Sequence, residues 1–152
     1  RRSSEALIAK PARVSRSAGA RQVLAGIVVA CIDNEETILS GMRVLLEGWG
    51  AQVIAAPTQK SLLGEISKAG VVPDVIIADY HLDDGHNGLD VIAAMRSRLS
   101  PKMFAILATA DRSAPLRAAA ANADIHILNK PLKPAALRAL LSNVSQERAA
   151  AE

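Results

Sequence analysis

The sequence predicts an α/β protein with a doubly wound parallel sheet of five strands and helices on both of its faces. Between residues 26 and 144, apolar runs of strand length alternate five times with segments of helical period. Strict alternation of this kind gives a parallel sheet that is covered on both sides. The runs are apolar throughout, as in strands whose two faces are both buried. Right-handed crossovers and one reversal of strand order then give the flavodoxin-like arrangement.

The first half of this region supplies three strands and two helices. Residues 26–32 (GIVVACI) form a continuous apolar run, which predicts the first strand. Apolar residues then recur at helical spacing over 38–49, and glycines at 48 and 50 mark the end of this predicted helix. A short strand over 51–55 follows, and then a helix over 62–69 that a glycine stops. A proline opens the next strand, 74–79, whose middle reads VIIA.

The second half repeats the pattern. We expect a helix over 89–99, which a following proline closes, and a strand over 104–109. Residues 114–122 are rich in alanine and predict a helix, and residues 125–128 predict the fifth strand. The last helix is expected over 137–144, where leucine and valine recur at helical spacing.

Composition limits the class of protein. A chain of 152 residues is one domain by its length. Half of its residues are apolar and only 2% are aromatic, so the core must be aliphatic. Cys31 is the single cysteine, which excludes an internal disulfide and favours a cytoplasmic location. No apolar stretch approaches the length of a bilayer span and no signal peptide is evident, so we expect no membrane contact from this fragment.

Charge divides the chain into a basic tail and a slightly acidic remainder. The net charge is +3, yet residues 1–25 carry six basic residues against one acidic residue. The tail has no aromatic residues among its basic ones, which disfavours a nucleic-acid surface. We expect a linker over 1–25 that is poorly ordered or partly helical, a domain over 26–145, and a fraying tail over 146–152. The first residue is arginine, so we also expect a fragment of a longer chain.

Polar residues follow four of the predicted strands. Asp33 and Asn34 come after the first strand, Asp79 ends the third, Thr109 ends the fourth, and Lys130 follows the fifth. Ligands of open parallel sheets bind at the carboxyl ends of the strands, beside the point where the strand order reverses. We therefore expect these side chains to converge at one edge of the sheet.

Such a cluster has a specific chemistry. Neighbouring carboxylates raise each other's pKa unless a cation lies among them. Mg²⁺ suits this role because it prefers oxygen ligands and keeps several waters, and Lys130 is a compact charge that suits a phosphate-like oxygen. A carboxylate beside a metal ion and a lysine predicts a phosphoryl-transfer site, where the carboxylate attacks and the cations offset the charge.

At this point the chain resembles the response-regulator receiver domains, over about residues 26–144. Four motifs of that family occur in order, each at a predicted strand end: Asp33 with Asn34, Asp79 within VIIADYHL, Thr109 before a small residue, and Lys130-Pro131. Any one of these motifs is weak, but the four together are specific.

The resemblance implies a role for each residue. Asp79 is expected to be the nucleophile that takes a phosphoryl group from the phosphohistidine of a histidine kinase or a histidine phosphotransfer domain. Thr109 and Lys130 are expected to bind phosphoryl oxygens, and a cis peptide bond is expected at Lys130-Pro131. The domain would catalyse only its own phosphorylation and dephosphorylation, as a signalling module that changes shape.

The resemblance also implies a metal site and two residues that tune the reaction. Mg²⁺ is expected to bind Asp33, Asn34, Asp79 and the backbone carbonyl of His81. His81 and Asp111 occupy positions that flank the phosphoryl group in the family and set its lifetime.

A finer resemblance concerns the parent protein. The segments EGWG, DYHLDDG with GLD, and NKPLKP are similar to receivers at the C-terminal end of hybrid sensor histidine kinases. We therefore expect the parent to be a hybrid histidine kinase.

Two positions depart from the family pattern. Asn34 stands where the family usually has a second acid that binds the metal, which removes one negative charge and predicts weaker metal binding. Ile127 stands where the family has an aromatic switch residue. Any switch must then rely on Thr109, the loop after it, and the helix over 114–122.

Three other interpretations remain. Asp33 has the capping-box spacing to Glu36 and could serve only as a helix cap. The domain could be a pseudo-receiver, a protein-interaction module that is not phosphorylated because Asn34 weakens the metal. It could also be a flavodoxin-like cofactor binder, in which case the purified protein would carry the colour of flavin.

Overall fold

The computed structural model describes residues 22–83 and 85–151, and most of the predicted linker lies outside them. Five parallel strands form one sheet in the order β2-β1-β3-β4-β5, which confirms the predicted fold. The strands are β1 (Val28–Ile32), β2 (Gln52–Ala56), β3 (Val75–Asp79), β4 (Phe104–Thr109) and β5 (His126–Asn129). The helices are α2 (Glu36–Gly48), α3 (Gln59–Ala69), α4 (Gly88–Arg98), α5 (Ala114–Asn122) and α6 (Pro134–Ala151), preceded by a 3₁₀ turn, η1 (Gln22–Leu24).

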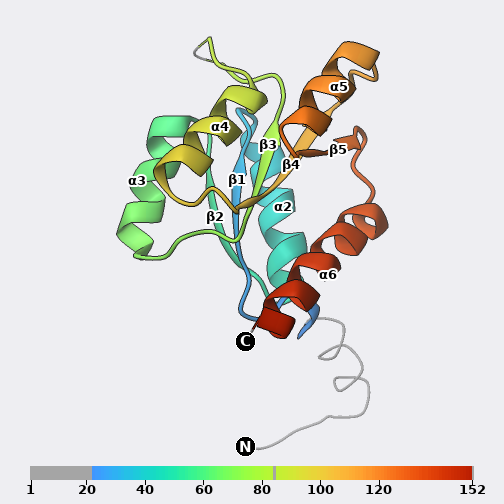
Figure 1. The fold of residues 1–152 in the computed structure, drawn as a ribbon. Helices are drawn as coiled ribbons and strands as arrows, with labels where there is room; N and C mark the ends of the chain where they lie inside the picture. The colour runs from blue at the N-terminus through green and yellow to red at the C-terminus, as the bar shows by residue number, and fades with distance from the viewer. Residues whose placement is uncertain (1–21, 84, 152) are drawn as a thin grey trace, which may run out of the picture.

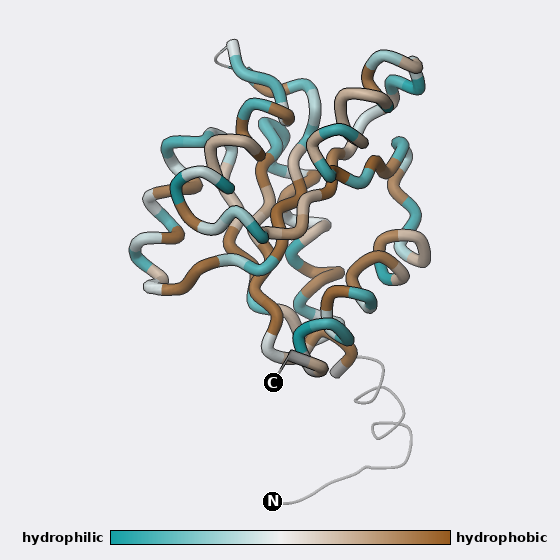
Figure 2. The backbone as a smooth tube through the Cα atoms, in the orientation of Figure 1, coloured by the Kyte–Doolittle hydropathy of each residue, from teal (hydrophilic) through white to brown (hydrophobic). Residues whose placement is uncertain are grey.

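Helices cover both faces of the sheet (Figure 1). On one face, α3, α4 and α5 pack through a core that includes Leu62, Ile92 and Leu116. On the other face, α2 and α6 pack through Leu46 and Leu141. Figure 2 shows the apolar residues concentrated along the central strands, with hydrophilic residues on the loops around them. The aliphatic core that composition predicts is therefore divided between two layers, one on each side of the sheet.

The strand order reverses between β1 and β3. From β1 the chain moves outward to β2, returns to β3 on the other side of β1, and continues outward to β4 and β5. The register pairs Ile32 with Ala78, Asp79 with Ala108, and Thr109 with Asn129 in successive strands. The carboxyl ends of β1, β3 and β4 therefore lie near one level, beside the point of reversal.

Helices α3 and α4 begin at this same edge with capping boxes. Thr58 and Ser61 exchange side-chain and backbone hydrogen bonds at the start of α3, and Asn87 and Asp90 do so at the start of α4. These contacts satisfy amide groups that a helix start otherwise leaves unpaired. The loop that follows Asp79 is thus anchored directly to the start of α4.

Both ends of the domain extend further than we predicted. Leu24 is fully buried and its amide donates to the carbonyl of Trp49 at 2.9 Å, so the folded unit begins before residue 26. Helix α6 continues through Ala151, past the domain boundary predicted at residue 145. Arg148 on this extension places its Nη1 atom 2.6 Å from Oδ2 of Asp74, which precedes β3. This ion pair lies at the opposite edge of the sheet from the carboxyl ends of the strands. Within the described residues, no helix combines the length and the apolar character that crossing a bilayer requires.

Cys31 should be an unreactive thiol in the folded protein. It is 2% exposed on β1, and burial raises its pKa to about 12, with Arg43 opposing and Asp33 adding to the shift. The thiolate is the reactive form, so we expect alkylation at pH 8 to be at least about a hundredfold slower in the native protein than in the chain unfolded in guanidinium. Intact mass measures the alkylation rate in each state. Equal rates in the native and unfolded states would contradict the burial of Cys31.

Candidate functional site

Four strand ends bring the predicted residues to one edge. Asp33 follows β1, Asp79 ends β3, Thr109 ends β4 and Lys130 follows β5. In the described part of the chain, the only buried polar or charged residues are Asp33, Asp79 and Thr109. A buried polar side chain is costly unless it is paired or has a functional partner. The concentration of all three at the carboxyl edge therefore marks this edge as the candidate site.

Asp79 and Lys130 form the central contact. The Nζ atom of Lys130 lies 2.7 Å from Oδ1 of Asp79, and the aspartate side chain is only 8% exposed. Partial burial lowers the pKa of Lys130, but the hydrogen bond and charge of Asp79, together with the charges of Asp33 and Glu35, outweigh it and raise the pKa. Lys130 is therefore a firmly charged ammonium group held against the predicted nucleophile. The cis peptide bond predicted at Lys130-Pro131 is present.

Asp33 belongs to the same site and does not cap α2. Burial is the largest influence on its carboxyl group and raises its pKa, and the charge of Asp79 raises it further. A hydrogen bond from the amide of Glu35 (2.9 Å) and the charge of Lys130 oppose these effects. Helix α2 begins at Glu36 with Glu35 at its N-cap and no side-chain cap, so the capping-box alternative is wrong. One pocket is lined by Asp33, Asp79 and Lys130 together.

The donor groups of this pocket fit Mg²⁺. Two buried carboxylates face a single ammonium group, which leaves a surplus of negative charge that a hard divalent cation would offset. Asn34 is exposed directly after Asp33. The backbone at His81 is held by an isolated antiparallel bridge to Asn87. Within residues 22–83 and 85–151, no three His, Cys, Asp or Glu side chains gather at one point, so a metal ion here would also need amide, carbonyl or water oxygens.

Thr109 is fully buried at the end of β4 and its hydroxyl is held within its own loop. Its Oγ1 accepts a hydrogen bond from the amide of Asp111 at 3.0 Å. Its carbonyl accepts the amide of Lys130 at 2.9 Å. The hydroxyl proton is not used by the Asp111 contact, so it is available for an oxygen atom bound at Asp79.

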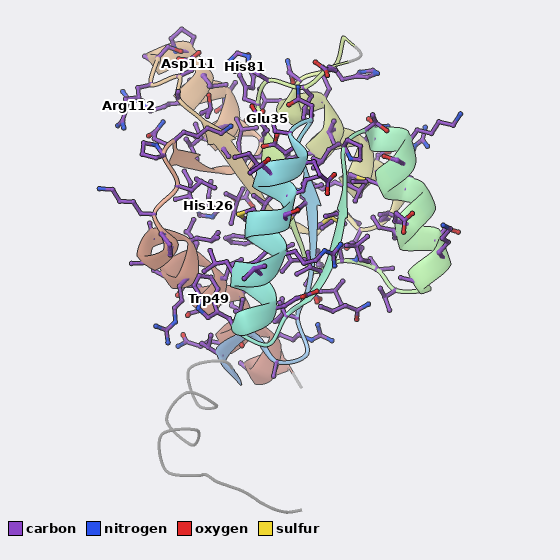
Figure 3. All side chains as sticks on the ribbon, turned by 180° about the vertical axis from the view of Figure 1, so that it is seen from behind. Glu35, Trp49, His81, Asp111, Arg112 and His126 are labelled. Carbon is purple, nitrogen blue, oxygen red and sulfur yellow. The ribbon has the colours of Figure 1, made fainter. Side chains whose placement is uncertain are left out.

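His81 and Asp111 lie at the mouth of the site, on the loops that follow β3 and β4. Figure 3 shows both at the same end of the molecule as Glu35. Hydrogen bonds from Ser113 lower the pKa of Asp111, and the charge of His81 lowers it further. Asp111 is therefore a carboxylate at the rim, next to an exposed imidazole.

Two residues that sequence reasoning missed shape the site. A Cβ atom on Gly88, the first residue of α4, would meet the carbonyl oxygen of Asp79 at 2.5 Å and a methyl carbon of Leu107 at 2.6 Å. Only glycine allows this close approach, which sets α4 against the backbone of Asp79. Asn129 reaches across from β5 to the loop after Thr109. A glycine that opens a helical pattern is a signal for the first, whereas nothing in the sequence singles out the second.

Known proteins share this sequence pattern. The family model of the response regulator receiver domain matches residues 29–142. The transcriptional regulatory protein KdpE of Mycobacterium tuberculosis is 34% identical over 125 residues, which cover 82% of this chain and 54% of KdpE. The KDP operon transcriptional regulatory protein KdpE of Escherichia coli is 32% identical over 114 residues, covering 74% of this chain and 48% of that protein. This chain thus spans about half the length of the curated relatives it matches.

Solved structures share the fold. A response regulator receiver domain protein from Clostridium thermocellum superposes with a TM-score of 0.72 at 23% identity, covering 83% of this chain and 99% of that one. The chemotaxis protein CheY4 of Vibrio cholerae superposes with a TM-score of 0.70 at 22% identity, covering 79% and 99%. The fold agrees with theirs and the family model spans most of the sequence. This chain therefore belongs to the response regulator receiver domain family.

Proposed function

We propose that Asp79 accepts a phosphoryl group from a phosphohistidine in a Mg²⁺-dependent reaction, and that the domain changes conformation in response. The observation that carries this proposal is the contact between the buried carboxylate of Asp79 and the ammonium group of Lys130, with a second buried carboxylate, Asp33, in the same pocket. Two carboxylates repel an anionic phosphoryl group, so such a site can bind one only when Lys130 and a metal ion offset the negative charge.

The chemistry assigns a task to each side chain. A carboxylate oxygen of Asp79 forms a bond to phosphorus while the bond from phosphorus to the donor's imidazole nitrogen breaks, and the electron pair leaves with the imidazole. Lys130 offsets the charge of the transferring group. The hydroxyl of Thr109 donates a hydrogen bond to a phosphoryl oxygen once it is attached. Lys130 then exchanges part of its contact with Asp79 for a phosphoryl contact, and the Thr109 hydroxyl gains one. Both changes would alter the forces on the loops that carry these residues.

Asp33, Asn34, Asp79 and the carbonyl of His81 would hold the metal ion. When bound, Mg²⁺ would supply positive charge against the two carboxylates and the phosphoryl oxygens. The protein itself would hold these oxygen atoms at one edge of the sheet, and the pairing of β1 with β3 supports this arrangement.

The proposed partner is a histidine kinase or a histidine phosphotransfer domain, met in the cytoplasm. The curated relatives are named as transcriptional regulatory proteins. The segments EGWG, DYHLDDG and NKPLKP instead support a hybrid histidine kinase as the parent. We propose the hybrid kinase, and the flanking coding sequence decides: a kinase domain before Arg1 supports it, and an adjoining DNA-binding domain contradicts it.

Asp79→Asn should abolish phosphorylation. We expect acetyl phosphate with Mg²⁺ to add the mass of one phosphoryl group to the parent chain, because the carboxyl group of Asp79 is the proposed nucleophile and Lys130 and Mg²⁺ would offset the charge of the transferring group. The amide that replaces it in the variant is not a nucleophile of this kind, so the adduct should be absent by intact mass. Asp124→Asn is the matched control, since Asp124 is exposed on the loop after α5. A parent chain that forms no adduct would favour the pseudo-receiver, and an adduct that survives in Asp79→Asn would mean another acceptor.

Asn34→Asp should tighten Mg²⁺ binding. The substitution adds a negative ligand beside Asp33, so we expect the dissociation constant to fall by roughly tenfold. Calorimetric titration of Mg²⁺ measures it directly. Asn122→Asp adds the same charge at the end of α5 and should leave the constant unchanged. If Asn34→Asp binds no more tightly than the parent, Asn34 is not near the ion.

His81→Ala and Asp111→Ala should each shorten the life of the phosphorylated state several-fold. Both side chains lie on loops that follow site strands, at the same end of the molecule as Glu35 (Figure 3), and we expect their removal to admit water to the phosphoryl group. The measurement is the decay of the adduct after acetyl phosphate is removed. His86→Ala changes another exposed histidine of the same loop and serves as the control. Decay at the parent rate in both variants would rule out this role.

A further inference from the structure

The loop between β4 and α5 is held from the neighbouring strand by one side chain. Asn129, the last residue of β5, places its Nδ2 atom 3.2 Å from the carbonyl oxygen of Thr109 and 3.4 Å from that of Asp111. Both partners are acceptors, so the amide nitrogen and not the amide oxygen must face them. One NH₂ group therefore bridges two carbonyl groups of the loop that carries Thr109.

Hydrogen bonds inside this loop link the segment held by Asn129 to the site on one side and to α5 on the other. Towards the site, the amide of Asp111 donates to Oγ1 of Thr109 at 3.0 Å, which sets the direction of the hydroxyl group. Away from the site, the amide of Ser113 donates to Oδ1 of Asp111 at 2.8 Å, and Ser113 is the N-cap of α5. A change at Asn129 would thus reach both the hydroxyl group of Thr109 and the first turn of α5.

Asn129 is also next to Lys130 in the chain. The amide of Lys130 donates to the carbonyl of Thr109, as the side chain of Asn129 also does. This carbonyl therefore accepts hydrogen bonds from two consecutive residues. Ile127, two residues earlier, is only an aliphatic side chain packed against the core on the α5 side. The polar connection between the Lys130 segment and the loop at Thr109 is made by Asn129 and the backbone.

We propose that Asn129 is a positioning residue, whose amide clamps the loop 109–113 and thereby fixes the Thr109 hydroxyl relative to Asp79 and the start of α5 relative to β5. Its effect on phosphorylation rests on the function proposed above, whereas the clamp itself is a property of the unphosphorylated chain. Asn129 does not touch the reacting atoms and provides no oxygen to the metal ion. Its loss should therefore slow the reaction without changing Mg²⁺ binding.

Asn129→Leu tests the clamp, because leucine keeps the size of the side chain and removes both donors. Asn122→Leu is the control, at the exposed end of α5. Asn129→Asp is a second variant of nearly the same shape that also lacks the donors, for use if leucine prevents folding. Each full chain is compared by amide hydrogen exchange without phosphoryl donor, and by the rate of phosphorylation with acetyl phosphate over a range of Mg²⁺ concentrations.

We expect exchange at the amides of Asp111 and Ser113 to accelerate about tenfold, the effect of losing roughly one hydrogen bond, while amides in β1 and β3 are unchanged. At saturating Mg²⁺ the phosphorylation rate should fall about tenfold, and the half-saturating Mg²⁺ concentration should stay the same. This split is the signature of positioning, since general damage to the site would change both quantities.

Other results would overturn the inference. Unchanged exchange at Asp111 and Ser113 would mean that Asn129 does not hold the loop. Faster exchange with an unchanged phosphorylation rate would remove the positioning role, and a parallel change in Mg²⁺ dependence and in β1 and β3 exchange would mean a general structural role. A parent chain that takes up no phosphoryl group contradicts the proposed function instead, and the exchange measurement still decides whether the clamp exists.

Discussion

Lys130 is the cation that allows two carboxylates to remain buried at one edge of the sheet. Its ammonium group contacts Asp79 directly, and its charge also lowers the pKa of Asp33. Burial and mutual repulsion act against both carboxylates, because a charge removed from water is stable only when another charge or a set of hydrogen bonds replaces the water. One positive charge against two negative ones leaves the site short of cations. This imbalance favours the binding of a further cation, which the proposed phosphoryl transfer would require.

Topology produces this charge cluster from residues that are distant in the sequence. Asp33 and Asp79 are 46 positions apart, yet β1 and β3 are hydrogen-bonded neighbours, and their last paired residues are Ile32 and Ala78. Each aspartate comes one residue after the last paired residue of its own strand, so both carboxylates lie at the same level of the sheet edge. The glycine at position 88 then allows α4 to begin directly against the backbone of Asp79. Strand register therefore determines the positions of the site residues more than the conformations of the loops do.

The same reasoning explains what could be predicted from sequence. Apolar strands followed at once by polar residues predict the fold and the meeting of Asp33, Asp79, Thr109 and Lys130, because parallel strands end at a common edge. The start of the domain was not predictable in this way, since Leu24 stands at the end of a basic, alanine-rich segment and its burial depends on α2 and α6. The contact of Asn129 depends on a side-chain direction and on the path of a loop, and periodicity carries no signal for either. Asp33 also matches a capping pattern, and only the backbone at Glu35 distinguishes the two roles.

The contacts that hold α5 determine how a structural change at the site could reach this helix. This helix has only two buried side chains, Leu116 and Ala120, so packing holds it weakly along its length. Its C-terminal end is held by Arg96, whose guanidinium group donates to the carbonyls of Met103, Ala123 and Asp124 at 2.6 to 2.9 Å. Its N-terminal end is held by Ser113 and the loop that carries Thr109.

A short helix that is fixed at both ends and lightly packed between them is governed by its end contacts. The end held by Arg96 lies before β5, at the opposite edge of the sheet from the site. The end held at Ser113 is two hydrogen bonds from the hydroxyl of Thr109, through the backbone and side chain of Asp111. An aromatic side chain on β5 is therefore not needed to connect the site with α5, because the loop itself makes the connection. In the proposed reaction, the amide of Asp111 and then the start of α5 are the first groups hydrogen-bonded in series to the Thr109 hydroxyl.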